Sequence, residues 1–387
     1  MHICYLCSEY PPGPHGGVGT FTQTLGRALV RRGHSVTVVG FGQSMRTRIA
    51  QHEDEGVVVV RIRSSRVPRL GALSSSVSLT RALRRVNRVR RIDVLEGSEL
   101  SLALLPRRLL PTKVIRMHGG HHFFCHDLGH KRQPVRSWLE RRSFRNADHL
   151  CAVSRHVANV TSELLDLHQR SIEILPNPVD TIHFAPQPNV TEVPYRIMFV
   201  GTICEKKGVR QLIQAMPAIL EREPKAHLQL VGRDWHDPST GANYTDGMRQ
   251  LAAQLAPGHV SFLGTVNNNE LPILLASASV CVMPSHAEAM SLTWLEALSV
   301  GRPLVGSRAG PGPEVVEDGV SGLLCDPHDP KSIASCVNSL FAAPALRERL
   351  GQGGRHRAVE LFSLEALAIR NENFYARCTE AAHAQIS

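Results

Sequence analysis

Two glutamates eight residues apart, Glu288 and Glu296, have the spacing in this chain that points most directly to chemistry. The sequence between them predicts a strand end, a loop and the start of a helix that contains the second glutamate. Eight residues advance a helix by a little over two turns, so both carboxylates can face one cleft. Free N–H groups at the start of a helix bind anions, phosphate above all. Here these groups belong to Ala289, Met290, Ser291 and Leu292.

This order of a carboxylate, an anion site and a second carboxylate suits a nucleotide sugar. One carboxylate would bind sugar hydroxyls, the N–H groups would bind the diphosphate, and the other carboxylate would bind the ribose. A capped surface helix with two incidental glutamates has the same spacing. Spacing alone does not separate these two interpretations.

The elements that must position these residues alternate between strand and helix. Apolar runs predict strands at 3–6, 35–41, 56–62, 92–95, 113–117 and 149–153, with helices between several of them. A proline-rich stretch at 176–186 predicts a linker. After it, strands are expected at 195–201, 227–231, 260–263, 280–283, 303–306 and 322–325, and helices at 209–222, 246–256, 292–300 and 331–341. The pattern is typical of two doubly wound α/β domains with parallel sheets, whose ligands bind at the carboxyl ends of the strands.

The segment from Pro284 to Leu324 resembles the retaining glycosyltransferases of the GT-B fold, known as glycosyl transferases group 1. Glycogen synthases, sucrose-phosphate synthases and bacterial mannosyltransferases are in this group. The resemblance rests on the spaced glutamates, on Gly301-Arg-Pro303 and on Glu314-Val-Val-Glu-Asp-Gly-Val-Ser-Gly322. It covers nearly the whole chain and is strongest over 195–330. It implies two Rossmann-like domains that face an inter-domain cleft: an acceptor domain at 1–182, joined by a C-terminal helix at about 362–387, and a donor domain at 186–361.

The resemblance also implies roles for single residues of the donor domain. Glu288 corresponds to the glutamate that holds donor hydroxyls near C3, and Glu296 to the one on the ribose. Lys207 corresponds to the lysine that neutralises the diphosphate. Many relatives carry an arginine where this chain has Thr202, so one phosphate cation is missing or comes from elsewhere, with Lys206 as the stand-in.

Other positions follow from the same resemblance. The usual Glu-Gly-Phe-Gly is replaced by Glu288-Ala-Met-Ser, and the larger Met290 is expected to narrow the sugar pocket. Contacts to the base and ribose are expected from Arg233, Thr265 and Val266, although the apolar positions fit a packing role equally well.

The first domain has two further candidates. Gly16 and Gly17 resemble the Gly-Gly loop that closes over the donor, although a simple flexible loop would have the same composition. His118 resembles the histidine that contacts the C6 hydroxyl of the sugar. The expected catalytic residues are therefore Glu288, His118 and Lys207.

Six histidines and cysteines lie between residues 118 and 130, a density that suggests zinc. They are His118, His121, His122, Cys125, His126 and His130. The H-E-x-x-H motif and paired C-x-x-C finger motifs are missing from the sequence. The preferred interpretation is a loop that binds the acceptor, mainly through His121 and His122. Surface histidines without a function are the third interpretation, beside zinc binding. No metal and no other cofactor is expected.

The net charge of +10, from 44 basic and 34 acidic residues, is unevenly distributed along the chain. Arg81, Arg84, Arg85 and Arg88 recur on one helix face, and Arg90 and Arg91 follow. This is either a solvated face or a dock for an anion such as a lipid headgroup, a diphosphate or a nucleic acid. Nucleic acid is the least favoured partner, because aromatic residues make up 5% of the chain and none interleaves with these arginines.

Cysteine usage and hydropathy indicate the compartment. Nine scattered cysteines without a leader-like N-terminus predict reduced thiols, and no apolar run approaches the ~20 residues that span a bilayer. The expected location is the cytoplasm, with peripheral contact at the inner face of the membrane as an option.

The sequence therefore predicts a retaining, metal-independent glycosyltransferase. It would move a hexosyl unit from a nucleotide diphosphate sugar, UDP-sugar first and GDP-sugar second, to an acceptor hydroxyl. The acceptor would be a saccharide, a lipid-linked saccharide or a small molecule, in polysaccharide, glycolipid or metabolite biosynthesis. The alternatives are a GT-B-type nucleotide-sugar epimerase and a non-catalytic nucleotide-sugar-binding protein.

Overall fold

The computed structural model describes the chain except for residues 14–15, 43–48, 65–70, 111, 237–240 and 385–387. Two compact units are present. Unit 1 consists of Met1–Pro178 together with Leu364–Ser387, and unit 2 consists of Val179–Ser363. The chain thus passes between the units at two points, after Pro178 and after Ser363. The first of these lies inside the proline-rich stretch that the sequence marks as a linker.

Unit 1 is built on an eight-stranded sheet of order β3-β4-β2-β1-β5-β6-β7-β8. Its strands are β1 (His2–Leu6), β2 (Ser35–Gly42), β3 (Ile49–Asp54), β4 (Val57–Arg63), β5 (Val94–Gly97), β6 (Lys113–Met117), β7 (His149–Ala152) and β8 (Ile172–Ile174). All pairs are parallel except β3 with β4. Runs such as Val57–Val60 suit strands that helices cover on both faces.

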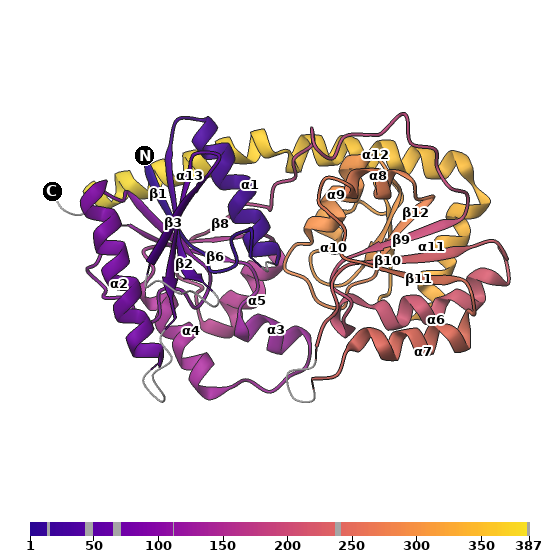
Figure 1. Cartoon of the computed structure of the whole chain (residues 1–387), viewed down its shortest axis with the longest axis horizontal. Coiled ribbons are helices and arrows are strands. Elements are labelled where there is room, and N and C mark those ends of the chain that lie inside the picture. The colour runs from indigo at the N-terminus through magenta and orange to yellow at the C-terminus, as the bar shows by residue number, and fades with distance from the viewer. Residues whose placement is uncertain (14–15, 43–48, 65–70, 111, 237–240, 385–387) are drawn as a thin grey trace. The chain divides into compact units, whose positions relative to one another are not determined.

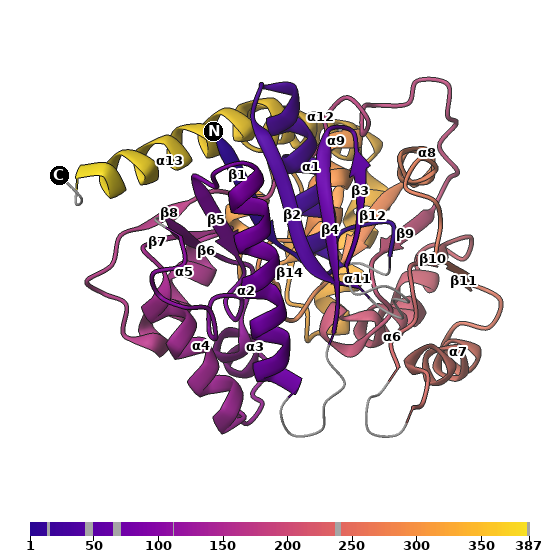
Figure 2. The same ribbon diagram turned by 60° about the vertical axis from the view of Figure 1, so that its left-hand side comes forward.

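Helices lie on both faces of this sheet (Figures 1 and 2). They are α1 (Gly17–Arg31), α2 (Gly71–Val89), α3 (His121–Asp127), α4 (Pro134–Asn146), α5 (Arg155–Leu165) and α13 (Leu364–Ala384). Val57 and Val59 pack in one core with α1 and α13, whereas Val58 and Val60 line a cavity with α2. Alternate residues of β4 therefore face opposite helices, as the pleat of a strand requires.

Unit 2 is built on a six-stranded parallel sheet of order β11-β10-β9-β12-β13-β14. Its strands are β9 (Arg196–Val200), β10 (His227–Val231), β11 (Val260–Gly264), β12 (Val280–Met283), β13 (Leu304–Ser307) and β14 (Leu323–Cys325). Its helices are α6 (Val209–Leu220), α7 (Tyr244–Leu255), α8 (Leu271–Ala276), α9 (Leu292–Val300), α10 (Gly312–Val315), α11 (Pro330–Ala342) and α12 (Pro344–Phe362), with a 3-10 turn, η1 (Glu205–Lys207). Both units are doubly wound α/β structures, as the sequence predicts.

Several helices and strands are not evident from the sequence, and two segments expected to be loops are helical. The strands β3 and β8 and the helices α5, α8 and α12 were not predicted. The histidine-rich stretch expected to be a loop contains the helix α3, and Gly16 and Gly17, also expected in a loop, are the N-cap and first residue of α1. The C-terminal helix expected at about 362–387 is α13, which begins at Leu364 in unit 1, whereas α12 ends at Phe362 in unit 2.

Charge is distributed unevenly between the units. Unit 1 contains 29 basic and 16 acidic residues, a net charge of +13, and unit 2 contains 15 basic and 18 acidic residues, a net charge of −3. Helix α2 carries Arg81, Arg84, Arg85 and Arg88. Among the described residues, no helix is both long enough and apolar enough to cross a membrane.

Candidate functional site

The predicted donor residues of unit 2 follow the carboxyl ends of four neighbouring strands. Thr202 and Lys207 follow β9, Arg233 follows β10, Thr265 follows β11 and Glu288 follows β12. Because β11, β10, β9 and β12 are adjacent and parallel, these ends share one edge of the sheet. Ligands of open α/β sheets bind at this edge.

Lys207 and Glu288 form an ion pair at this edge, between Nζ and Oε1. The two side chains are 17% and 11% exposed. Burial by itself would raise the pKa of Glu288, but the charges of Lys207 and Lys206 outweigh it and hold that pKa below its usual value. Glu288 is therefore a carboxylate at neutral pH, ready to accept hydrogen bonds from hydroxyl groups.

The loops that carry this pair are locked together by their backbones. Gly208, directly after η1, has φ of +71°, and a Cβ at this position would collide with the carbonyl oxygen of Pro284. The N–H of His286 donates to the carbonyl oxygen of Lys206 over 2.8 Å. A glycine at 208 therefore lets the lysine turn approach the glutamate loop, and this approach places Lys207 against Glu288.

Helix α9 begins at Leu292, as the sequence predicts, but most of the N–H groups assigned to its start lie outside the helix. Of the four residues expected to supply N–H groups, Leu292 is the first helical residue and Ser291 is the N-cap. Ala289 and Met290 lie in the preceding loop and are buried. The N–H groups at the start of the helix therefore begin at Leu292. Fewer of the predicted N–H groups than expected belong to the anion site. The Oγ of Ser291 lies 3.1 Å from the Oγ1 of Thr293.

Glu296 lies one turn into α9, a helix buried almost all round, and is 8% exposed. Burial raises its pKa to about 7. Its Oε2 is buried and has no hydrogen-bond partner in the described part of the chain. A buried carboxylate oxygen without a donor is costly, so a ligand hydroxyl that donates to it would recover free energy.

A cationic side chain from the neighbouring strand end lies beside Thr202. The Nε of Arg233 donates to Thr202 Oγ1 over 3.4 Å. The ends of β9 and β10 come this close because Gly232 has φ of +149°, and a Cβ there would collide with the carbonyl oxygen of Gly201. The guanidinium of Arg233 thus lies beside the position for which the resemblance implies an arginine. The charge of Lys206, the expected stand-in, helps to lower the pKa of Glu288.

Thr265 and Val266 lie beyond Gly264 at the end of β11, and Thr265 is exposed. Strand β11 is the edge of the sheet, with β10 and β9 between it and β12. These two residues are therefore the members of the predicted donor set that stand furthest along the sheet from Glu288.

In unit 1, His118 follows β6 and packs edge-on against Phe21, with ring centroids 4.8 Å apart. Burial, and then the nearby charge of Arg116, lowers the pKa of His118 to about 3. Its imidazole is therefore neutral at physiological pH and can donate or accept one hydrogen bond to a hydroxyl.

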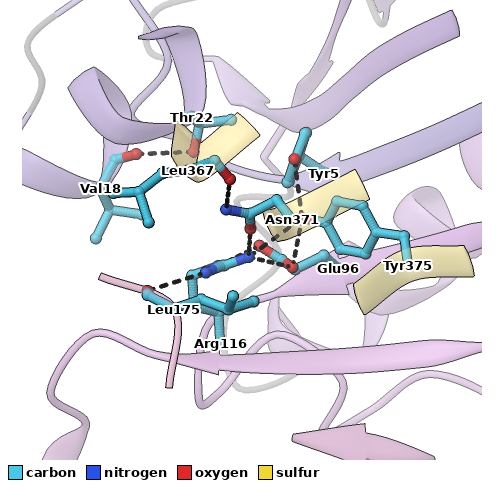
Figure 3. A network of polar contacts seen from close by, with 9 residues as sticks. All are labelled: Tyr5, Val18, Thr22, Glu96, Arg116, Leu175, Leu367, Asn371 and Tyr375. Atoms are coloured by element: carbon cyan, nitrogen blue, oxygen red, sulfur yellow. Dashed lines mark hydrogen bonds and ion pairs between the residues drawn. The ribbon is translucent and has the colours of Figure 1, made fainter. Parts of the chain in front are cut away.

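A buried polar network around Arg116 is shown in Figure 3. The guanidinium of Arg116 forms two bonds to Glu96, of 2.8 and 3.1 Å, and lies 4.9 Å from the centre of the Phe21 ring. Asn371 and Tyr375 of α13 complete the network. Asn371 accepts a bond of 2.5 Å from Arg116, and Tyr375 donates one of 2.8 Å to Glu96. The C-terminal helix thereby helps to fix the residue that supports Phe21 and, through it, His118.

The other predicted residues of unit 1 occupy different settings. The N–H of Gly16 donates to Glu9 over 3.1 Å. His121 is half-buried, and its Nε2 accepts from the N–H of Gln133. His122 is 1% exposed and its ring pairs with the buried Glu140, which places it in the interior of unit 1 and away from a surface that would meet an acceptor. In the described part of the chain, no three histidine, cysteine or carboxylate side chains are grouped as metal ligands would be.

Two acidic residues near this histidine segment, Glu99 and Glu140, escaped the sequence analysis. Glu99 comes two residues after the end of the short strand β5, a position at the carboxyl edge of the sheet. Glu140 is one acid in a basic helix, and nothing in its sequence context indicates burial.

Comparison with known families and proteins gives a consistent result. The family described as Glycosyl transferases group 1 matches residues 181–357, and Glycosyltransferase Family 4 matches residues 15–183. A GDP-mannose-dependent alpha-(1-6)-phosphatidylinositol monomannoside mannosyltransferase of Mycolicibacterium smegmatis is 28% identical, over 92% of this chain and 93% of that protein. Glycogen synthase of Mycobacterium tuberculosis is 27% identical, over 97% and 94%.

The fold has a solved counterpart as well. Sucrose-phosphate synthase of Thermosynechococcus elongatus superposes with a TM-score of 0.85 at 20% identity, covering 98% of this chain and 100% of that structure. At that identity the likeness concerns the fold alone, which is GT-B in both.

Proposed function

This chain belongs to the group 1 glycosyltransferases of the GT-B fold, and we propose that it transfers a hexosyl unit with retention of configuration and without a metal ion. Glycosyl transfer from a nucleotide sugar is the activity that the family and the relatives establish. The observation that carries the finer proposal is the Lys207–Glu288 ion pair, whose glutamate precedes the helix that contains Glu296. Among the described residues, the Oε2 of Glu296 has no hydrogen-bond partner.

The surroundings of Lys207, Glu288 and Glu296 suit a different role in donor binding for each side chain. Lys207, assisted by Arg233, would neutralise the diphosphate as it leaves with growing negative charge, which is why no metal ion is needed. Glu288, held ionised, would accept hydrogen bonds from hydroxyls of the donor sugar. Glu296 would bind the ribose hydroxyls through the oxygen that the protein leaves unpartnered.

The route of transfer is also part of the proposal. The acceptor hydroxyl would attack from the face on which the diphosphate leaves, and a diphosphate oxygen would take its proton. The neutral imidazole of His118 would bind the C6 hydroxyl of the sugar. The Gly16–Gly17 start of α1 carries no side chain that would obstruct a ligand.

The donor and the acceptor remain proposals at the level of class. A UDP-sugar is the first choice and a GDP-sugar the second. A structure of Anabaena HepE contains UDP-glucose, and the mycobacterial relative uses GDP-mannose, so both bases occur among similar proteins. The acceptor is a saccharide, a lipid-linked saccharide or a small molecule with a free hydroxyl, in polysaccharide, glycolipid or metabolite biosynthesis.

We further propose that unit 1 contacts anionic membrane surfaces through the arginine face, defined as Arg81, Arg84, Arg85, Arg88, Arg90 and Arg91. All six are exposed, and within the described residues none forms an ion pair. Each basic residue near an anionic surface contributes about 1 kcal/mol of attraction. This location would bring the enzyme to lipid-linked acceptors at the inner face of the membrane.

The direct test of the donor is a thermal-shift screen of UDP-, GDP- and ADP-sugars, with and without EDTA. A ligand that binds only the folded protein raises its melting midpoint. We expect one nucleotide series to raise the midpoint equally in both conditions. A rise that EDTA abolishes would contradict metal-independent binding. Conversion of the donor without any acceptor would indicate an epimerase, and binding without turnover a non-catalytic protein.

A further inference from the structure

Two buried carboxyl groups in unit 1, those of Glu99 and Glu140, belong to none of the donor-binding residues described above. Glu99 follows β5 and is 4% exposed, and Glu140 lies in α4 and is fully buried. The Oε1 atoms of both are buried, and neither has a hydrogen-bond partner among the residues that the structure describes. Buried carboxyl groups are rare unless they are paired, so this arrangement needs a physical cause.

Both carboxyl groups meet the turn that leads from β6 into α3. Glu140 Oε2 accepts from the N–H of His122 over 2.9 Å and pairs with the Nδ1 of the same residue. A Cβ on Gly120 would collide with Glu140 Oε1 and would lie 2.9 Å from the Cγ of Glu99. Gly120 thus lets two carboxyl groups from different elements reach the same turn.

Glu99 interacts with the part of the turn that contains His118. Its carboxyl group is hydrogen-bonded to its own backbone and to the backbone of His118 and Gly119. Burial, together with the charge of Glu140, nevertheless raises the pKa of Glu99 to about 8. At pH 7 Glu99 is therefore mainly protonated, while Glu140 is held by His122.

We infer that Glu99 and Glu140 are positioning residues: they hold the His118–Gly120 turn, and ionisation of Glu99 displaces His118 and lowers activity at alkaline pH. A second negative charge beside Glu140 would repel it and would find no donor for its free oxygen. The importance of this displacement for catalysis rests on the role proposed above for His118.

The surroundings of Glu99, Glu140 and His118 determine which of these three side chains titrates near pH 8. Glu99 faces Glu140 of α4 and the turn backbone, and Glu140 faces His122 of α3. His118 faces Phe21 of α1 and is influenced by Arg116 of β6. The pKa of His118 is about 3, so its ring does not titrate near pH 8. A change at His118 in that range must therefore come from a neighbour, and Glu99 is the neighbour whose pKa fits.

The test follows the ring signals of His118 by NMR between pH 6 and pH 10, in protein with isotope-labelled histidine. The signals are assigned by their loss in His118→Gln. In the wild type we expect them to shift with a midpoint near pH 8. In Glu99→Gln, which is permanently neutral and of the same shape, the shift should disappear. The exposed Glu163→Gln of α5 is the matched control and should behave as the wild type. An identical shift in Glu99→Gln, or none in the wild type, would overturn the inference.

Activity gives the second readout. The ratio of kcat at pH 9 to kcat at pH 7 should be at least about fivefold higher in Glu99→Gln than in the wild type. Glu140→Gln, which weakens the bond to His122, should lower kcat at both pH values, and its melting midpoint at pH 6 shows whether it folds. If no transferase activity is found, the NMR titration still decides the positioning role, so the two proposals fail separately. A superimposable pH profile for Glu99→Gln would refute the alkaline effect.

Discussion

At the scale of the residue, Glu296 shows a conflict between stability and binding. Its pKa is raised to about 7 from an ordinary value of 4.5, so the folded protein holds a proton that the unfolded chain releases. Stability from this group is complete below pH 4.5 and is lost as the pH rises through 7. Such a shift corresponds to up to about 3 kcal/mol. The ionised carboxylate of Glu296 thus destabilises the fold, and a ligand hydroxyl that donates a hydrogen bond to it would offset this cost.

We therefore predict opposite effects of Glu296→Gln on stability and on binding. The variant should melt at a higher temperature than the wild type at pH 8, because it buries no charge, and the difference should vanish near pH 4.5. Donor affinity should fall about tenfold, because a hydrogen bond to a charged group is lost. Thermal melts with and without nucleotide sugar measure both effects. Unchanged donor affinity would contradict the ribose role.

A second prediction concerns the division of labour between the two glutamates. Glu288 is ionised by its lysine pair and would touch the transferred sugar, whereas Glu296 would touch the nucleotide. Glu288→Ala should therefore reduce kcat more than Glu296→Ala, which should act mainly through the KM for the donor. Steady-state kinetics on both variants separates the two parameters. Equal losses of kcat would refute this assignment.

Residues that are close in the chain can be connected from the sequence alone. The spacing of Glu288 and Glu296 is compatible with one site, but only the surrounding motif favours this interpretation over a capped surface helix. The pairing of Arg233 with Thr202 could not be predicted, because it depends on the close approach of two strand ends at Gly201 and Gly232. Glu140 was missed for a similar reason: its burial is a result of how α4 packs, which its basic neighbours in the sequence conceal.

At the scale of the element, apolar strands were found and amphipathic or short elements were missed. Strand β3 is exposed along most of its length, so it lacks the hydrophobic run that marks β1, β2 and β4. Helix α12 was missed, whereas the C-terminal helix expected at about 362–387 begins at Leu364 as α13. The change of unit coincides with the break between these two helices at Ser363.

Helix α13 offers a prediction about its own docking. Tyr375 donates to Glu96 and lies 3.2 Å from the Nη2 of the fully buried Arg116 (Figure 3). Tyr375→Phe keeps the ring and removes these bonds to charged groups, which should cost about 1.5–3 kcal/mol. Urea denaturation at pH 7 measures the loss. The exposed Arg377 on the same helix provides the control, and Arg377→Gln should change stability by less than about 0.5 kcal/mol. A Tyr375→Phe protein as stable as the wild type would show that water replaces the hydroxyl.

At the scale of the whole molecule, the uneven charge is the main feature that the motifs do not explain. The net charge of +13 in unit 1 and −3 in unit 2 shows that the basic character of the chain belongs to one unit. A fold does not require such asymmetry, but attraction to an anionic surface does. The arginine face contributes six of these charges on one helix and the residues that follow it.

We predict that the protein binds vesicles that contain anionic lipid and that the arginine face is responsible. Arg84→Glu with Arg88→Glu should weaken co-sedimentation with phosphatidylserine-containing vesicles at least about tenfold, since each basic residue contributes about 1 kcal/mol. Arg222→Glu with Lys225→Glu, on exposed residues of unit 2, changes the net charge equally and should have little effect. Because exposed charges are screened, binding of the wild type should also fall steeply between about 0.1 and 0.5 M salt. Equal weakening by both double variants would mean that net charge alone, and not this helix face, attracts the protein to the surface.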